Sequence, residues 1–165
     1  MNETMNDKVE RFTLHNDRGQ SVLEAELVKL SLSQDPSKRV YGPFIRYSWQ
    51  VNGQQFESSG AGSLCLLPDA SGFILIEDDW KPDNAVLLDA YGKDRMRLTV
   101  PRELIPWMDD SSIRSAGFLW IGPSKEDGQC TLIGTADDIL AGFGDFGCDF
   151  DYVNGVFLKA YKVRI

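Results

Sequence analysis

The residues of this sequence that could do chemistry are mostly carboxylates. They are densest at Glu77-Asp78-Asp79-Trp80, and Asp83 follows closely. A pair of carboxylates can hydrolyse a glycosidic bond when a fold holds the two groups at a defined separation. Consecutive residues at the end of a strand point in opposite directions, so this run does not form such a pair by itself. A solvated loop is the usual role of a charge run, an interaction surface anchored by Trp80 is the next, and catalysis is a distant third.

A second group of acids stands beside an aromatic residue, where Trp107 precedes Asp109 and Asp110. An aromatic ring in acidic surroundings can anchor a protein interface, because the ring supplies buried area and the acids supply charge. The residues that we expect to contact a partner are therefore Glu77, Asp78, Asp79, Trp80, Asp83, Trp107, Asp109 and Asp110.

A glycine-rich run near the C-terminus, residues 142–147, matches the dinucleotide-binding pattern G-x-G-x-x-G. That pattern binds a pyrophosphate only between a strand and the N-terminus of a helix. Here a strand is expected to follow, Phe143 stands in the approach path, and Asp145 would repel phosphate. Residues 126–158 also hold seven acids and no Lys or Arg. We interpret the run as a turn between strands, with no bound cofactor.

Asp149, Asp151 and Asn154-Gly155 invite comparison with a calcium-binding loop. An EF-hand needs oxygen ligands at alternate positions and a Glu at the twelfth, but Ala160 stands there. Acids on the solvent face of a hairpin are the favoured interpretation, and no metal site is predicted. A weak cation site at a sheet end, with Asp145, Asp149 and Asp151, stays open as an alternative.

The nucleophiles and bases of common catalytic sets are sparse. His15 is the single histidine, so any Ser-His or Cys-His arrangement would have to use it, and nothing near it supports that role. We expect His15 to be exposed. Cys65, Cys130 and Cys148 show no Cys-x-x-Cys spacing, so reduced thiols in the core are expected. No catalytic residue is predicted, and the protein is not expected to be an enzyme.

The net charge of −8 limits the partners. A phosphate backbone would be repelled, so nucleic-acid binding is disfavoured and a basic protein partner is favoured. No apolar run approaches the length of a membrane-spanning helix, and the polar N-terminus lacks the apolar region of a secretory signal. A cytoplasmic protein without membrane contact is the expectation.

The elements that position these side chains are expected to be strands, because apolar and polar residues alternate along nearly the whole chain. This alternation is clearest at Phe44–Val51, and Asn52-Gly53 then predicts a two-residue hairpin turn that places Trp49 opposite Phe56. Residues 21–33 are ambiguous. Their leucines recur at helical spacing, yet we favour a strand with a bulge at residues 27 and 28.

Further hairpins are predicted on both sides of the least regular segment. Residues 85–91 and 95–100 are expected to pair, with an apolar face shared by Val86, Leu88, Ala90, Met96, Leu98 and Val100. Residues 101–115 admit a short helix from Arg102. Residues 148–153 and 156–165 are expected to flank a two-residue turn at Asn154-Gly155, which places Tyr152 opposite Phe157 and Cys148 opposite Tyr161.

About ten short strands with regular turn signals and little helix are typical of an all-β protein. The predicted fold is an antiparallel β-sandwich or barrel built of hairpins, with one or two short helices. Residues 1–165 are expected to form a single β domain, and residues 1–7 to be disordered. No linker or internal repeat divides the chain.

Two stretches, YSWQVNGQQF at 47–56 and NAVLLDAYGKDRMRLTVP at 84–101, resemble small acidic bacterial proteins of unassigned function. Some of those proteins are similar to immunity proteins of polymorphic toxin systems, of the Rhs and contact-dependent types. The resemblance implies an inhibitor that binds a toxin tightly and occludes its active site, and it carries over no residue role. Many such toxins are nucleases with basic clefts, to which an acidic protein would be steered.

Two other functions remain as alternatives. One is a small-ligand or carbohydrate-binding β domain that uses Trp80, Trp107 or Trp120. The other is a hydrolase that uses two carboxylates from distant parts of the sequence, which would require a cleft with two acids roughly 5–10 Å apart.

Overall fold

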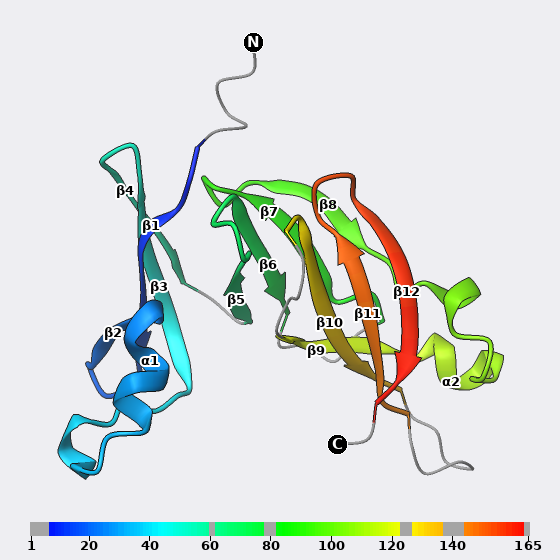
Figure 1. The fold of residues 1–165 in the computed structure, drawn as a ribbon, viewed down its shortest axis with the longest axis horizontal. Coiled ribbons are helices and arrows are strands. Elements are labelled where there is room, and N and C mark those ends of the chain that lie inside the picture. Colours follow the sequence, from blue (N-terminus) through cyan, green and yellow to red (C-terminus); the bar gives the residue numbers. More distant parts are fainter. Residues whose placement is uncertain (1–6, 60–61, 78–81, 123–126, 137–143, 164–165) are drawn as a thin grey trace.

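The protein is a stack of three antiparallel β-sheets (Figure 1). The structure is a computed structural model, and it describes residues 7–59, 62–77, 82–122, 127–136 and 144–163. The N-terminal sheet has the order β2-β1-β3-β4 and consists of β1 (Glu10–Asn16), β2 (Ser21–Leu23), β3 (Phe44–Val51) and β4 (Gln54–Ser59). The central sheet is a meander of β5 (Ser63–Leu66), β6 (Gly72–Ile76), β7 (Ala85–Asp89) and β8 (Asp94–Leu98). The C-terminal sheet is a meander of β9 (Gly117–Gly122), β10 (Gln129–Thr135), β11 (Phe146–Asp151) and β12 (Val156–Lys162).

The two inner strands of the central sheet, β6 and β7, are buried on both faces. Phe73 and Leu88 pack into a core shared with the N-terminal sheet, whereas Ile74 and Leu87 pack into a second core shared with the C-terminal sheet. Successive side chains of a strand point to opposite faces, so a strand covered on both sides must be apolar at every position. Residues 73–76 of β6 and 85–88 of β7 are uninterrupted apolar runs and meet this requirement. The predicted all-β sandwich is confirmed, with three layers instead of two.

This double burial corrects one predicted face. Val86, Leu88 and Ala90 lie in the core shared with the N-terminal sheet, whereas Leu98 and Val100 lie in the other core. Leu98 pairs with Ala85 and Met96 pairs with Leu87. The apolar residues of β8 therefore share a face with Ala85 and Leu87, and not with Val86 and Leu88 as predicted. The sequence could not distinguish the two sets, because both are apolar.

The hairpin of β3 and β4 has the predicted register. Asn52 and Gly53 form its turn with φ values of 50° and 79°. Trp49 pairs with Phe56, and the two rings are stacked with their centroids 6.0 Å apart. The Trp49 indole N–H also donates to the carbonyl of Ala90 at 2.8 Å, which ties this hairpin to the central sheet.

The strand predicted for residues 21–33 is wrong beyond Leu23, because Glu24–Ser31 form helix α1. Leu27 and Leu30 are partly buried against the core of the N-terminal sheet. The helical spacing of these leucines therefore indicated the correct secondary structure, a helix. Acidic Glu24 and Glu26 in the first turn and Lys29 in the last turn also suit the helix dipole.

The hairpin of β11 and β12 departs from its prediction too. Phe150, and not Tyr152, pairs with Phe157, and Cys148 pairs with Ala160 instead of Tyr161. The loop spans the four residues between Asp151 and Val156, because the Asp151 carboxylate accepts hydrogen bonds from the N–H groups of Val153 and Asn154. This cap moves the turn back along the chain and leaves Gly155 at a φ of 74°.

The segment between the central and C-terminal sheets contains two short helices, where the prediction allowed one. The 3-10 helix η3 (Arg102–Leu104) begins at the predicted residue, and α2 (Asp110–Arg114) follows it. A second 3-10 helix, η2 (Pro36–Lys38), lies in the loop after α1. Among the residues that the structure describes, no helix is both long and apolar enough to cross a membrane.

Candidate functional site

The acidic cluster at residues 77–83 is visible only at its two ends, because Asp78, Asp79 and Trp80 lie outside the described residues. Glu77 follows β6 and forms an ion pair with Arg97 of β8, with Oε1 and Nη1 2.6 Å apart. Asp83 has a positive φ of 56°, and its Oδ1 accepts a hydrogen bond from the Val100 N–H at 2.7 Å. Both ends of the cluster are thus fastened to β8 and to the residues just after it.

The second predicted group lies at the start of α2. The Asp109 carboxylate caps this helix and accepts hydrogen bonds from the Ser112 N–H at 2.7 Å and the Ser111 hydroxyl at 2.8 Å. These bonds lower the pKa of Asp109. Trp107 is partly buried against the core, and Lys162 Nζ lies 5.9 Å from its ring centroid. Asp110 is exposed.

His15 lies between two serines and is only partly exposed, in contrast to the exposed position expected for it. Its Nδ1 is 2.6 Å from Ser21 Oγ and its Nε2 is 2.8 Å from Ser48 Oγ. Burial and the charge of Arg46 lower the pKa of His15. Ser48 is buried and the imidazole is made less basic, so this pair is poorly suited to nucleophilic catalysis and instead links β1, β2 and β3.

The three cysteines are free thiols, as expected. Cys130 and Cys148 are buried, and Cys65 is partly buried. Burial raises the pKa of Cys65 to about 11 and the pKa values of Cys130 and Cys148 to about 12. The thiolate is the reactive form, so these cysteines are inert at neutral pH.

Asp149 and Asp151 of the C-terminal sheet accept hydrogen bonds from other groups of the protein. Asp149 Oδ1 accepts a hydrogen bond from the Thr131 hydroxyl at 3.1 Å, and Asp151 caps the β11–β12 loop. Within the described ranges, no group of three or more His, Cys, Asp or Glu side chains could hold a metal ion. In the glycine-rich run, residues 142 and 143 are not described, and Phe146 begins β11. A strand therefore follows this run, which is incompatible with the dinucleotide motif.

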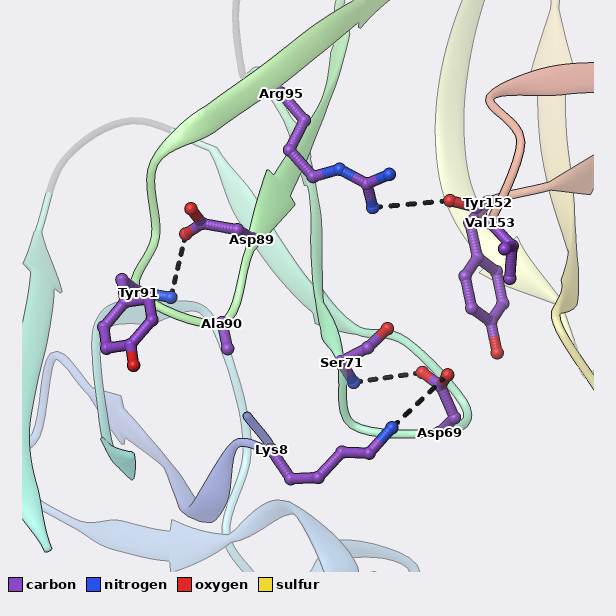
Figure 2. A pocket seen from close by; sticks show the side chains of 9 residues that line it. All are labelled: Lys8, Asp69, Ser71, Asp89, Ala90, Tyr91, Arg95, Tyr152 and Val153. Carbon is purple, nitrogen blue, oxygen red and sulfur yellow. Dashed lines mark hydrogen bonds and ion pairs between the residues drawn. The ribbon is translucent and has the colours of Figure 1, made fainter. Parts of the chain in front are cut away.

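Sequence reasoning missed a pocket of about 500 Å³ (Figure 2). It lies where the β5–β6 turn, the β7–β8 turn and the β11–β12 loop meet the segment that precedes β1. The residues that line it are Lys8, Asp69, Ser71, Asp89, Ala90, Tyr91, Arg95, Tyr152 and Val153. None of them belongs to the predicted partner-binding set. The turn residues at these positions were the available signal, but nothing in the sequence showed that the turns converge.

The charged groups of the pocket are engaged with neighbours. Lys8 Nζ lies 3.6 Å from Asp69 Oδ2, and Asp69 Oδ1 accepts a hydrogen bond from the Ser71 N–H. Asp89 Oδ1 accepts hydrogen bonds from the N–H groups of Tyr91 and Lys93, at 2.9 and 3.0 Å. These bonds fix the β5–β6 and β7–β8 turns that form the pocket walls.

Arg95 and Tyr152 form the wall beside the C-terminal sheet. Arg95 Nη1 donates to the Tyr152 carbonyl at 3.4 Å, as Figure 2 shows. The Tyr152 hydroxyl is buried and makes no hydrogen bond of standard geometry with the described residues. It points toward the Asp69 carboxylate, and burial together with that negative charge raises the pKa of Tyr152.

Asp69 and Asp89 both line this pocket, so they are the candidate carboxylate pair for the hydrolase alternative. A glycosidase needs one carboxylic acid with a raised pKa to protonate the leaving group. Although burial alone would raise it, hydrogen bonds from Ser71 and the charge of Lys8 hold the pKa of Asp69 below its usual value. Asp89 Oδ1 is committed to two backbone N–H groups. The arrangement is better suited to binding than to acid catalysis.

Comparisons with known proteins identify a fold but no family. No family model and no curated protein matches the chain. The structure is similar to one chain in the solved structure of Tne2 in complex with Tni2, with a TM-score of 0.65. The two chains are 11% identical, and the similarity covers 94% of this chain and 99% of that chain. This likeness extends over the three-sheet arrangement as a whole.

Proposed function

We propose that the protein is a non-enzymatic, cytoplasmic binding protein, an immunity-type inhibitor that neutralises a basic bacterial toxin by covering its active site. The net charge of −8 carries the proposal, because a negative potential attracts a basic partner and speeds the encounter. Two further observations support it. The fold is similar to that of a chain solved in a complex of two proteins, and the histidine and the cysteines occupy structural positions.

The proposed contact surface is the acidic and aromatic set predicted from the sequence: Glu77, Asp78, Asp79, Trp80, Asp83, Trp107, Asp109 and Asp110. Internal contacts divide the roles within it. Glu77 forms an ion pair with the Arg97 side chain. Asp83 and Asp109 accept hydrogen bonds from backbone N–H groups, after β8 and in the first turn of α2. Trp107 and the exposed Asp110 are proposed to touch the partner directly.

The test begins with the product of the neighbouring gene. The two proteins are co-expressed, and their affinity is measured by calorimetry at low and high salt. We expect the protein to relieve toxicity and to bind more weakly at high salt, because salt screens charge attraction. A neighbour that is neither secreted nor toxic, or that fails to bind, would overturn the proposal.

A matched pair of charge reversals tests the contact surface. Asp110→Lys places a positive charge beside Trp107, whereas Asp17→Lys makes the same change in the exposed turn between β1 and β2. We expect Asp110→Lys to weaken binding about tenfold or more and Asp17→Lys to change it much less. Equal effects would show that only the net charge matters and that the surface lies elsewhere.

A further inference from the structure

The pocket between the turns is built before any ligand arrives. The Val9 N–H donates to the Ala70 carbonyl at 2.7 Å, which fixes the segment carrying Lys8 against the β5–β6 turn. The Asp89 carboxylate fixes the β7–β8 turn, and the Arg95 guanidinium bridges the central sheet to the β11–β12 loop. A wall held in place by internal bonds loses little conformational freedom on binding, which favours a small ligand.

The charges of the pocket balance. Lys8 and Arg95 supply two positive charges, and Asp69 and Asp89 supply two negative charges. Lys8 and Asp69 already form an ion pair, and Asp89 is compensated by backbone N–H groups. A ligand with a net charge would gain little here, because an anion would also face the carboxylates of Asp69 and Asp89, and a cation would also face Lys8 and Arg95.

The remaining surface combines rings with hydrogen-bonding groups. The Tyr91 hydroxyl donates to the Asp7 carboxylate, so its ring is held in the wall of the pocket beside Ala90 (Figure 2). Arg95 N–H groups are donors, the Ser71 hydroxyl is a donor and an acceptor, and the outer oxygen of Asp89 is an acceptor. Ligand pockets of this size combine apolar walls with a few such polar groups.

We infer that this pocket binds an uncharged, polyhydroxylated small molecule of the size of a monosaccharide or disaccharide. Each hydroxyl of such a ligand can both donate and accept, which suits the mixed groups of Arg95, Ser71 and Asp89. The apolar C–H face of a sugar ring can lie on the ring of Tyr91. The inference is independent of the proposed inhibitor function, and it locates the site away from Trp107 and Trp120.

The test is a two-dimensional amide NMR titration of the full chain. The neutral probes are glucose, N-acetylglucosamine and maltose, and the charged comparison probes are glucuronate and arginine. At about 10 mM, a ligand with a Kd of about 1 mM would occupy most of the sites. We expect a neutral probe to shift the amide signals of Tyr91, Arg95 and Val153, without comparable shifts at Trp120.

Matched arginine variants test the assignment. Arg95→Met removes the pocket donor from an exposed position, whereas Arg102→Met changes an exposed arginine of η3 outside the pocket. We expect Arg95→Met to weaken binding of the neutral probe about tenfold, from the loss of a charge-assisted hydrogen bond, and Arg102→Met to leave it unchanged. Ser71→Ala, which retains the charge balance, is expected to weaken binding by a smaller factor.

Three outcomes would overturn the inference: no shift at the pocket with any neutral probe, shifts there only with a charged probe, or shifts centred on Trp120. None of these outcomes depends on the protein partner. Failure of the sugar titration would therefore leave the inhibitor proposal standing, and failure to bind a toxin would leave the pocket inference standing.

Discussion

The single histidine makes the stability of the N-terminal sheet sensitive to pH. His15 contacts Ser21 and Ser48, and burial and Arg46 lower its pKa, although Glu57 acts in the opposite direction. The unfolded chain therefore takes up a proton near pH 6.5, before the folded protein does. We expect the free energy of unfolding to be highest above that pH and to fall as the pH is lowered through the pKa of the folded state.

Urea denaturation at a series of pH values between about 5 and 8 measures this dependence. His15→Gln is the control, because glutamine retains hydrogen-bonding groups but does not titrate. The difference in unfolding free energy between the two proteins should change over this range. A constant difference would show that His15 has the same pKa in the folded and unfolded states.

Tyr152 combines a buried ring with an unsatisfied hydroxyl. A buried polar group without a hydrogen bond costs about 1–3 kcal/mol, so its removal need not destabilise the protein. We expect Tyr152→Phe to leave the free energy of unfolding unchanged or to raise it by about 1 kcal/mol. Chemical denaturation measures the change.

Tyr47→Phe is the matched control, because the buried Tyr47 hydroxyl donates to the Gly62 carbonyl at 3.5 Å. We expect this variant to lose about 1 kcal/mol. If Tyr152→Phe loses as much, its hydroxyl must donate to Asp69 in solution, and the Asp69 carboxylate would then be even less available as an acid.

At the scale of elements, two glycines of neighbouring hairpins serve different purposes. Gly53 has a φ of 79° and open space around it, so Gly53→Ala should cost only the strain of a positive φ, about 1 kcal/mol. A Cβ at Gly72 would lie 2.2 Å from the Leu88 carbonyl oxygen of the neighbouring strand. Gly72→Ala should cost about 3 kcal/mol or more, because β6 and β7 would have to separate. Equal losses in thermal or urea unfolding would contradict this account.

The two Asn-Gly dipeptides show what a local pattern can predict. Asn52-Gly53 forms the predicted turn, because the strand that precedes it alternates without interruption. Asn154-Gly155 has the same sequence but lies three residues after Asp151, whose carboxylate caps an earlier turn. The α1 segment was mispredicted for a related reason, since its leucines satisfy both periodicities and only their packing against the N-terminal sheet decides between them.

The pocket could not be predicted in the same way. Its walls come from turns that lie far apart in the sequence, such as Asp69 and Tyr152, and they meet only because the three sheets stack. The acidic clusters can be recognised in the sequence because their residues are contiguous. In the fold, Asp109 caps α2 and Asp83 accepts the N–H of Val100, and charge density alone reveals neither role.

At the scale of the whole molecule, the central sheet contributes side chains to both cores of the part of the chain that the structure describes. Phe73 and Leu88 face one core, and Ile74 and Leu87 face the other, so each core depends on the same two strands. The pocket lies at one end of this stack, between turns of the central and C-terminal sheets. Its shape therefore depends on the packing of these layers, and loss of either core should also disrupt the pocket.

This dependence predicts that the three sheets unfold together, as the expected single domain requires. Leu87→Ala removes a fully buried side chain from the core next to the C-terminal sheet and should cost about 2–5 kcal/mol. We expect the NMR signals of Leu14 in β1 and Cys148 in β11 to disappear at the same urea concentration, both in the original protein and in the variant. Leu158→Ala, at an exposed position of β12, is the control and should shift neither midpoint appreciably. If Leu87→Ala shifts the midpoint of Cys148 but not that of Leu14, the chain contains two independently folding units.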